Sequence, residues 1–351
     1  MRFLLSAALF AALASQVSAQ TSTATAVIKN GMGPVAFLRF SPDGQELARI
    51  CQFGPVALFS TNSYNKLRTF SIGMRMVAYS SDGTRIATAE GTDGARVWDA
   101  ALPGKRLPSS PAVGVEEVYL LDTPLQVLQA PSRDAMVRVF WTEFSPDGSR
   151  LITTHANGHV KVFNTSSWAV EDDLMLTESE VRAAALSPDG KTLVIGDVGG
   201  LLHVWSVEQK VEIKRTSTPG AILAIAFAAD GRTFVTVHRG PSLSVVLIWD
   251  TTSKVPDERS GFISATFSKD GTILALGGSH IELIDPTSRK QLRIIELPEM
   301  TLREANQQFE NQPGADVRIP VSITALAFSP DGRTLAAGLR DGTVRLLKIN
   351  P

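Results

Sequence analysis

Short runs of apolar residues recur along the whole chain, and polar turns separate them. Runs such as Val35–Phe40 and Ile323–Phe328 hold small and apolar residues and end at a turn. A second apolar run follows each turn, and a third run, such as His159–Phe163, alternates apolar with polar residues. Runs of this length with a period of two are typical of β-strands, and the alternating ones are half exposed. The pattern predicts an all-β protein.

One turn motif repeats seven times. Its fullest form is Phe40–Gly44, with the sequence Phe-Ser-Pro-Asp-Gly. Proline fixes φ, aspartate can bond to backbone N–H groups and glycine accepts positive φ, so each copy predicts a tight hairpin. The spacings between successive glycines are 39, 65, 42, 41, 40 and 61. The seven glycines are Gly44, Gly83, Gly148, Gly190, Gly231, Gly271 and Gly332.

The spacing predicts the architecture. Four short antiparallel strands in a unit of about 40 residues are typical of a propeller blade. Seven such blades in a ring bury the faces that one blade alone would expose. We therefore expect residues 20–351 to form a single seven-bladed β-propeller of four-stranded antiparallel blades. The two long spacings predict insertions near residues 101–137 and 297–319, and Thr301 with Glu304 predicts a capping box that begins a short helix in the second.

The last unit stops after its third strand, so the last blade lacks an outer strand. The segment Thr23–Lys29 is rich in β-favouring residues and precedes the first unit. We expect it to complete the last blade and close the ring, because closure removes exposed strand edges.

The repeats resemble the WD40 family. Trp98-Asp99 and Trp249-Asp250 match the dipeptide that ends the third strand of a WD40 blade. The nearest competitor is the exported propeller of the TolB type, which also repeats Ser-Pro-Asp-Gly, but the Trp-Asp dipeptides favour WD40. The Gly-His dipeptide of the family is missing, and its turn aspartate appears only as Asp93 and Asp341 among the turns compared. We therefore expect the family's buried His–Ser/Thr–Asp–Trp network to be incomplete in every blade.

Residues 1–19 have the layout of a secretory signal peptide. Arg2 is followed by an apolar run from Phe3 to Leu13, and Val17-Ser18-Ala19 provides small residues before a cleavage site. The alternative is a membrane anchor, but the run is shorter than the roughly 20 residues that span a bilayer. The sequence thus predicts a secreted or periplasmic protein with no membrane insertion after cleavage.

The charge balance and the cysteine content limit which partners and which disulfides we expect. The chain has 34 Lys and Arg against 35 Asp and Glu, which does not favour binding to nucleic acid. Cys51 is the only cysteine, so no intrachain disulfide can form. We expect Cys51 to be a small core residue. We also expect the protein to be a monomer without a cofactor.

No catalytic constellation stands out, and we predict no catalytic residue and no metal site. His155 and His159 are four residues apart, but they flank a turn and lack a third nearby ligand. Gly190-Lys191-Thr192 resembles the end of a phosphate loop, yet Ala185 stands where that motif needs glycine. The aspartates of the seven turns have a sufficient structural role.

Binding candidates come from the turns between the second and third strands, which should open near the central channel. Cationic side chains there could contact an acidic peptide, although a solvated rim is the alternative. The candidates are Arg75, His155, Arg239, His280 and Arg340. We predict an exported scaffold that binds a protein or peptide through one face of the ring. The alternative is a propeller enzyme, a lactonase-like hydrolase or a quinone- or metal-dependent oxidoreductase, with its site at the channel mouth.

Overall fold

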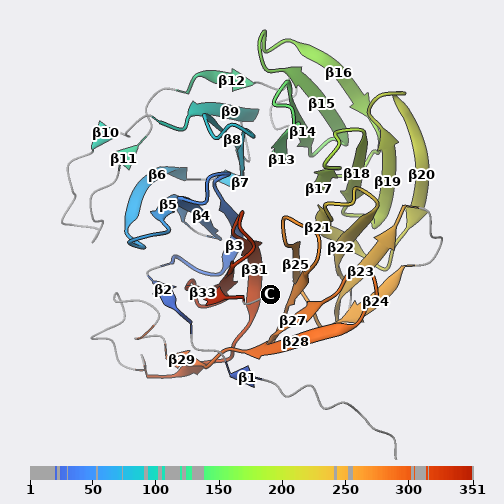
Figure 1. The fold of residues 1–351 in the computed structure, drawn as a ribbon. Coiled ribbons are helices and arrows are strands. Elements are labelled where there is room, and N and C mark those ends of the chain that lie inside the picture. Colours follow the sequence, from blue (N-terminus) through green and yellow to red (C-terminus); the bar gives the residue numbers. More distant parts are fainter. Residues whose placement is uncertain are drawn as a thin grey trace, which may run out of the picture.

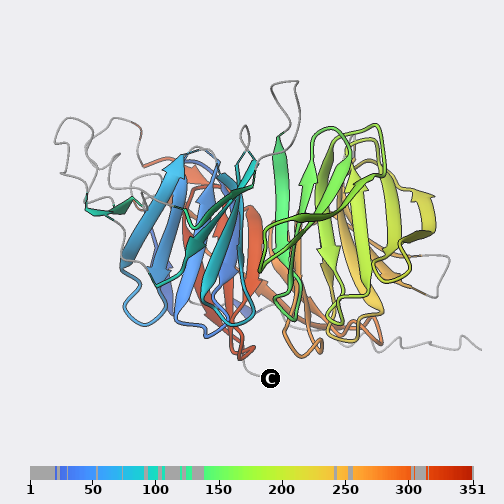
Figure 2. The ribbon, with the colours of Figure 1, turned by 90° about the horizontal axis from the view of Figure 1, so that it is seen from above.

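The strands of the protein form a closed ring of seven blades in the computed structural model (Figure 1), which confirms the predicted fold. The structure describes residues 20–21, 24–29, 31–52, 54–72, 74–90, 94–101, 105–106, 119–120, 124–128, 138–240, 243–251, 256–301, 304, 314 and 316–349. The predicted signal peptide, residues 1–19, lies outside these residues. Seen from the side, the strands of neighbouring blades stand next to one another (Figure 2).

Each blade has four antiparallel strands, described here from the channel outwards. The inner strands are β3 (Val35–Phe40), β7 (Met74–Tyr79), β13 (Val139–Phe144), β17 (Val181–Leu186), β21 (Ala221–Phe227), β25 (Ser264–Phe267) and β31 (Ile323–Phe328). The second strands are β4 (Glu46–Cys51), β8 (Arg85–Glu90), β14 (Arg150–His155), β18 (Thr192–Asp197), β22 (Thr233–Arg239), β26 (Leu274–Gly277) and β32 (Thr334–Leu339). The third strands are β5 (Pro55–Ser60), β9 (Gly94–Asp99), β15 (His159–Asn164), β19 (Leu201–Ser206), β23 (Ser244–Asp250), β27 (Ile281–Ile284) and β33 (Val344–Lys348).

The outer strands include the predicted closure. For blades 1 to 7 they are β6 (Lys66–Ile72), β12 (Gln126–Leu128), β16 (Val170–Met175), β20 (Val211–Ser217), β24 (Asp257–Ser260), β28 (Gln291–Glu296) and β2 (Ala26–Ile28). Strand β2 pairs antiparallel with β33, with Ala26 opposite Leu346 and Ile28 opposite Val344. Strand β2, which precedes the first repeat unit, therefore completes the last blade, as the sequence predicts.

Short strands extend the outer edges of two blades, which the sequence analysis did not foresee. Strand β1 (Gln20–Thr21) lies parallel to β28 of blade 6. Within the first expected insertion, β10 (Lys105–Arg106) pairs with β11 (Tyr119–Leu120), and β11 lies parallel to β6 of blade 1. In the second, β29 (Met300–Thr301) pairs with β30 (Arg318–Ile319).

The predicted capping box of the second insertion is present. The backbone N–H of Thr301 donates to the Glu304 carboxylate at 2.8 Å, and the backbone N–H of Glu304 donates to the Thr301 hydroxyl at 3.2 Å. Most of the helix predicted to follow it lies outside the described residues.

Six of the seven repeated turns share one hydrogen-bond arrangement. In the first, the Ser41 hydroxyl donates to Asp43 Oδ1 at 2.5 Å, and the backbone N–H of Gln45 donates to the same oxygen at 3.0 Å. Gly44 has a φ of 73°, a conformation that favours glycine. Six of the seven turns also approach the turn before them; a Cβ added to Gly44, for example, would lie 3.4 Å from Pro330 of blade 7. The turns thus lie side by side around one face of the ring.

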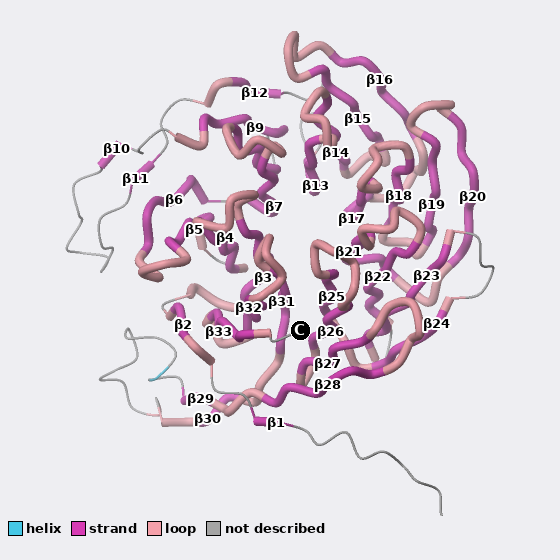
Figure 3. Tube along the Cα trace, viewed as in Figure 1, coloured by secondary structure: helices cyan, strands magenta, loops and turns pink. Residues whose placement is uncertain are grey.

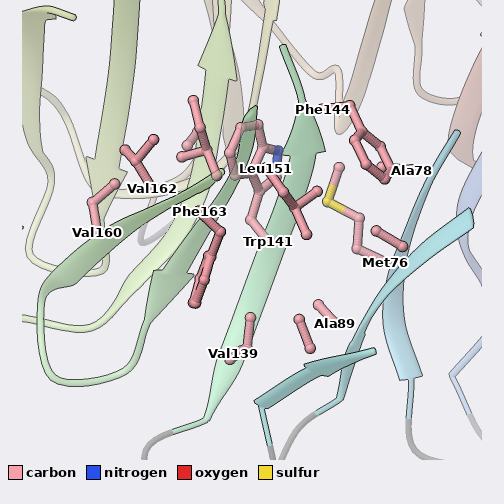
Figure 4. Packing of buried hydrophobic residues seen from close by; sticks show 14 of the residues in the cluster. Met76, Ala78, Ala89, Val139, Trp141, Phe144, Leu151, Val160, Val162 and Phe163 are labelled. Carbon is pink, nitrogen blue, oxygen red and sulfur yellow. The ribbon is translucent and has the colours of Figure 1, made fainter. Parts of the chain in front are cut away.

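Apolar side chains fill the space between blades. Figure 4 shows Met76 and Ala78 of blade 2 near Trp141 and Phe144 of blade 3, and all four belong to one buried cluster. Small alanines on the inner strands allow the blades to approach closely near the channel. Truncating a side chain as large as Trp141 to alanine would cost about 3–5 kcal/mol of stability.

Blade 5 carries a continuous polar chain inside its apolar core. The indole N–H of Trp249 donates to the Thr236 hydroxyl at 2.7 Å, and that oxygen lies 2.5 Å from His238 Nε2. His238 Nδ1 lies 3.4 Å from the Gly220 carbonyl. Because a carbonyl can only accept, Nδ1 donates, and Nε2 is left to accept from Thr236. Burial lowers the pKa of His238 and favours this neutral form.

Blade 3 has a broken version of the same chain. Phe163 stands opposite Leu151 where Trp249 stands opposite Phe234, so no indole N–H is available. The Thr153 hydroxyl lies 2.9 Å from His155 Nε2, but His155 Nδ1 has no partner. The buried Lys161 lies opposite Thr153 and forms an ion pair of 3.0 Å with Asp173. The charged Lys161 thus stands at the strand position that the apolar Leu247 occupies in blade 5.

Candidate functional site

The ring has two different faces. Figure 3 shows that loops and turns gather at the strand ends, whereas strands make up the body of each blade. We call the face with the seven repeated turns the Asp-Gly face, and its exposed carboxylates are Asp43, Asp82, Asp147, Asp189, Asp230, Asp270 and Asp331. We call the opposite face the link face. It carries the links between blades and the turns between second and third strands.

The Asp-Gly face keeps its negative charge well into the acidic range. In six of the turns a serine hydroxyl donates to the aspartate, and this bond is the main cause that lowers the pKa of that carboxyl. In blade 3, the bond from Ser145 helps lower the pKa of Asp147 to about 2. The fixed carboxylates therefore stay charged on this face.

Most inner strands contain a β-bulge near the end that lies on the link face. Six of them contain a register shift near their first residues, as between Val181 and Ala183 of β17. Such bulges re-aim the extra side chain. The extra residue stands eight positions before the glycine of the repeated turn. The residues at this position are Ala36, Arg75, Phe140, Arg182, Leu223 and Thr324.

Arg182 and Phe140 form a small recognition element at this level. The Arg182 guanidinium lies over the Phe140 ring, 5.4 Å from its centre. The Glu180 carboxylate holds the same guanidinium through contacts of 2.9 and 3.2 Å. The Arg182 side chain is nevertheless 45% exposed, so a partner can reach it. A guanidinium fixed by stacking loses little freedom when it binds a carboxylate.

The central channel lies next to this element. It has a volume of about 1000 Å³ and is lined mainly by apolar and small residues of the inner strands. Leu223 and Ile263 line it near the link face, and Arg239 lies at its edge. Deeper in the channel, the Arg39 guanidinium of blade 1 forms an ion pair of 3.0 Å with Glu143 of blade 3. The mouth on the link face therefore combines apolar surface with cationic side chains.

The predicted site residues fall into three groups. Arg239 ends β22 and Arg340 follows β32, and both are exposed on the link face. His280 is half-buried, with its ring edge-on to Phe262 at 5.5 Å between centres. Arg75 lies on β7.

His155 does not belong to this surface. It is 1% exposed, because it shares a face of β14 with Thr153 and points into the blade. Burial, followed by the nearby Lys161 charge, lowers its pKa to about 4. A partner cannot touch this side chain, so we remove His155 from the candidate contacts.

The sequence analysis missed Arg182, although a signal was present. Arg182 and Arg75 both stand eight residues before the glycine of their turn. Counting back from Gly190 as from Gly83 would have placed the two residues at the same position of their inner strands.

Two kinds of feature are absent from the described part of the chain. No three His, Cys, Asp or Glu side chains there come together as a possible metal site. No helix there is long and apolar enough to cross a membrane.

Comparison with known families finds a match in three stretches. The model of the WD domain, G-beta repeat, matches residues 123–164, 175–206 and 319–347. Each stretch ends at or near the end of a third strand, at Asn164, Ser206 and Leu347. The sequence repeat therefore begins before the inner strand of a blade.

Relatives of the chain include proteins of fruit flies. The chain is 24% identical over 297 residues to eukaryotic translation initiation factor 3 subunit I of Drosophila simulans, a match that covers 77% of this chain and 85% of the relative. The subunits of Drosophila melanogaster and Drosophila virilis are also 24% identical over 297 residues.

These relatives contradict the predicted location. Subunits of a eukaryotic translation initiation factor act in the cytoplasm, which conflicts with a secreted or periplasmic protein. The prediction of export rested on the pattern of residues 1–19, a basic start, an apolar run and a small-residue cleavage site, and it is wrong by this comparison.

The repeats found by comparison and the seven blades seen in the structure agree. Three stretches match the family model, and the described strands supply four-stranded blades at every position of the ring. The chain thus carries stretches that match the WD domain, G-beta repeat, and it folds as a seven-bladed β-propeller.

Proposed function

We propose that one copy of this chain acts as a protein-interaction scaffold, with residues 20–351 as a single domain and the link face as its binding surface. The WD40 propeller is typically a platform for other proteins. The relatives are named as a subunit of a larger factor, which fits a role within an assembly.

The single observation that carries the choice of face is the exposed Arg182 guanidinium stacked on Phe140 at the channel mouth. Arg239 and Arg340 add exposed positive charge on the same face, and Arg75 and His280 are further candidate contacts. The Asp-Gly face instead presents seven exposed carboxylates. An acidic segment of a partner would be attracted to the first face and repelled by the second.

Apolar residues at the link-face end of the central channel supply the rest of the proposed binding surface. Leu223 and Ile263 are half-buried there, and Leu243 is 62% exposed in the neighbouring turn. Interfaces gain most of their affinity from a few apolar or arginine anchors near the centre. We therefore propose a partner segment with an acidic residue beside an apolar one.

The test compares two triple variants with matched loss of charge. One combines Arg182→Ala, Arg239→Ala and Arg340→Ala on the link face. The control combines Lys191→Ala, Lys269→Ala and Arg333→Ala on the Asp-Gly face, where all three residues are exposed. Tagged proteins are incubated with extract of the source cells, and the co-purifying proteins are quantified by mass spectrometry.

We expect the link-face variant to retain at most about a tenth of a specific partner, since loss of a central arginine anchor often costs 2 kcal/mol or more. The control should retain that partner. Equal recovery with the two variants would overturn the choice of face, and the absence of any specific partner of the wild-type protein would overturn the scaffold function.

A further inference from the structure

A second hollow lies on the link face, outside the channel mouth. It is a cleft of about 680 Å³ at the boundary of blades 3 and 4. The link from blade 3, Met175–Ser179, forms one side, and the turn between β18 and β19, which includes Asp197 and Gly199, forms the other. Arg215 and Ser217 of β20 lie at its outer end. The cleft belongs to neither the channel nor the Arg182 element.

The chemistry of this cleft is different from that of the mouth. Asp197 is 1% exposed, and its two carboxylate oxygens accept hydrogen bonds from the Leu201 backbone at 2.8 Å and the Thr177 hydroxyl at 2.9 Å. Among the described residues, no lysine or arginine forms an ion pair with Asp197. Arg215 lines the same cleft but is paired with Glu212 at 3.1 Å.

A buried carboxylate normally has a cationic partner, because two hydrogen bonds alone do not replace the hydration of a full charge. An ionised carboxylate also has about four lone-pair sites, and two of those on Asp197 are used. Glu178 is exposed at the lip of the cleft and adds a second negative charge. Hydroxyl groups of Ser179 and Ser217 complete a lining suited to an ammonium or guanidinium group.

The cleft and the channel mouth are joined along the chain. Ser179 lines the cleft, Glu180 holds Arg182, and Arg182 stands at the mouth. Three residues of extended chain cover roughly 10 Å. An extended peptide that places a side chain at Arg182 therefore reaches the cleft two to four residues further along.

We propose that the cleft receives a lysine or arginine side chain of the same partner segment whose acidic residue meets Arg182. This inference rests on the proposed function of the link face. It adds that the recognised segment is extended and carries opposite charges two to four residues apart, with the basic side chain directed outwards over blade 4.

The probe is a phage library of random twelve-residue peptides, selected on the wild-type protein. We expect enrichment of peptides with an acidic and a basic residue two to four positions apart. A selected peptide should bind about fivefold more weakly to Glu178→Gln and at least tenfold more weakly to Asp197→Asn. Glu208→Gln is the matched control, because Glu208 is an exposed carboxylate at the other end of blade 4, between β19 and β20.

A second measurement does not depend on how well Asp197→Asn folds. Replacing the basic residue of the selected peptide by glutamine should weaken binding to the wild-type protein about tenfold and binding to Glu178→Gln by less. The same loss with both proteins would overturn the cleft assignment.

The outcomes separate the two proposals. Peptides enriched in acidic residues alone, with binding lost in Arg182→Ala, would overturn the cleft proposal and leave the link face as the binding surface. Selection of no peptide, or of peptides indifferent to Arg182→Ala, would overturn both.

Discussion

Blades 3 and 5 have the same strand register but different polar interiors. In blade 5 a donor chain runs from Trp249 through Thr236 and His238 to a backbone carbonyl. In blade 3 the same positions hold Phe163, Thr153 and His155, and the chain ends at an unpaired nitrogen. Blade 3 thus lacks both ends of the network of blade 5, the indole donor and the carbonyl that meets Nδ1.

The comparison also shows what replaces the lost bonds. Blade 3 has Lys161 at the level of Leu247 of blade 5, and the lysine is compensated by Asp173 on the outer strand. A buried ion pair is a weaker source of stability than a satisfied neutral network, because both charges must be desolvated. We infer that blade 5 stabilises the ring more than blade 3 does, and four predictions test this.

The largest difference is expected at the central threonine. Thr236→Val leaves the Trp249 indole and the His238 ring without their shared partner, and each buried unpaired group costs about 1–3 kcal/mol. We expect the free energy of unfolding to fall by about 4 kcal/mol, measured by urea denaturation. The matched variant Thr153→Val should cost only about 1.5 kcal/mol. Equal losses of stability in the two variants would show that the hydrogen-bond networks of blades 3 and 5 stabilise the protein equally.

The second prediction concerns pH and His155. Its pKa falls from an ordinary value of 6.5 to about 4 on folding, so the folded state favours the neutral ring. The resulting stability is present above pH 6.5 and is lost as the pH falls from 6.5 towards 4. The linkage amounts to roughly 3 kcal/mol. In His155→Gln the slope of stability against pH should be flatter across this window, and an unchanged slope would argue against a buried neutral His155.

The third prediction separates the two members of the ion pair. Asp173→Asn leaves the buried Lys161 without its carboxylate and should reduce stability by about 2 kcal/mol, less than for a fully buried pair because Asp173 is 37% exposed. Lys161→Met removes the buried charge and should be nearly neutral. Thermal unfolding of the two variants at neutral pH provides the measurement. A larger loss in Lys161→Met than in Asp173→Asn would contradict the view that the pair adds little.

The smallest effect is expected from restoring the missing indole donor in blade 3. Phe163→Trp would place an indole N–H near Thr153, as Trp249 is placed near Thr236, and should gain about 1 kcal/mol. The gain should disappear in the double variant Phe163→Trp with Thr153→Val, measured as a double-mutant cycle in urea. A gain that persists in the double variant would come from packing alone.

Most of the ring was predictable because its signal is repeated. Each Asp-Gly turn identifies a hairpin, and seven copies with a nearly constant spacing fix the number of blades. The incomplete last unit and Thr23–Lys29 together predicted the closure, which the pairing of Ala26–Ile28 with β33 confirms. The two-residue strands β1, β10 and β11 have no comparable pattern and were not predicted.

The site was less predictable because it depends on the direction of single side chains. His155 follows Thr153 by two residues and shares its inward face, so its position after an apolar strand was no evidence of exposure. Arg182 stands at a bulge of β17, where its side chain is 45% exposed, and apolar patterning does not reveal such a bulge. The partnership of Lys161 with Asp173 requires the register between β15 and β16, which hydrophobic patterning does not specify.

The closure of blade 7 also sets the order in which the protein can be completed on a ribosome. Ile28 pairs with Val344, which is synthesised 316 residues later. At about 5–20 residues per second, roughly 15 to 60 seconds pass between them. During this time Ala26–Ile28 has no strand to join, and the flank of blade 1 that will meet blade 7 stays uncovered. The ring is therefore closed only after β33 has been synthesised, and a nascent chain that stalls before β33 remains an open arc with an uncovered blade at each end.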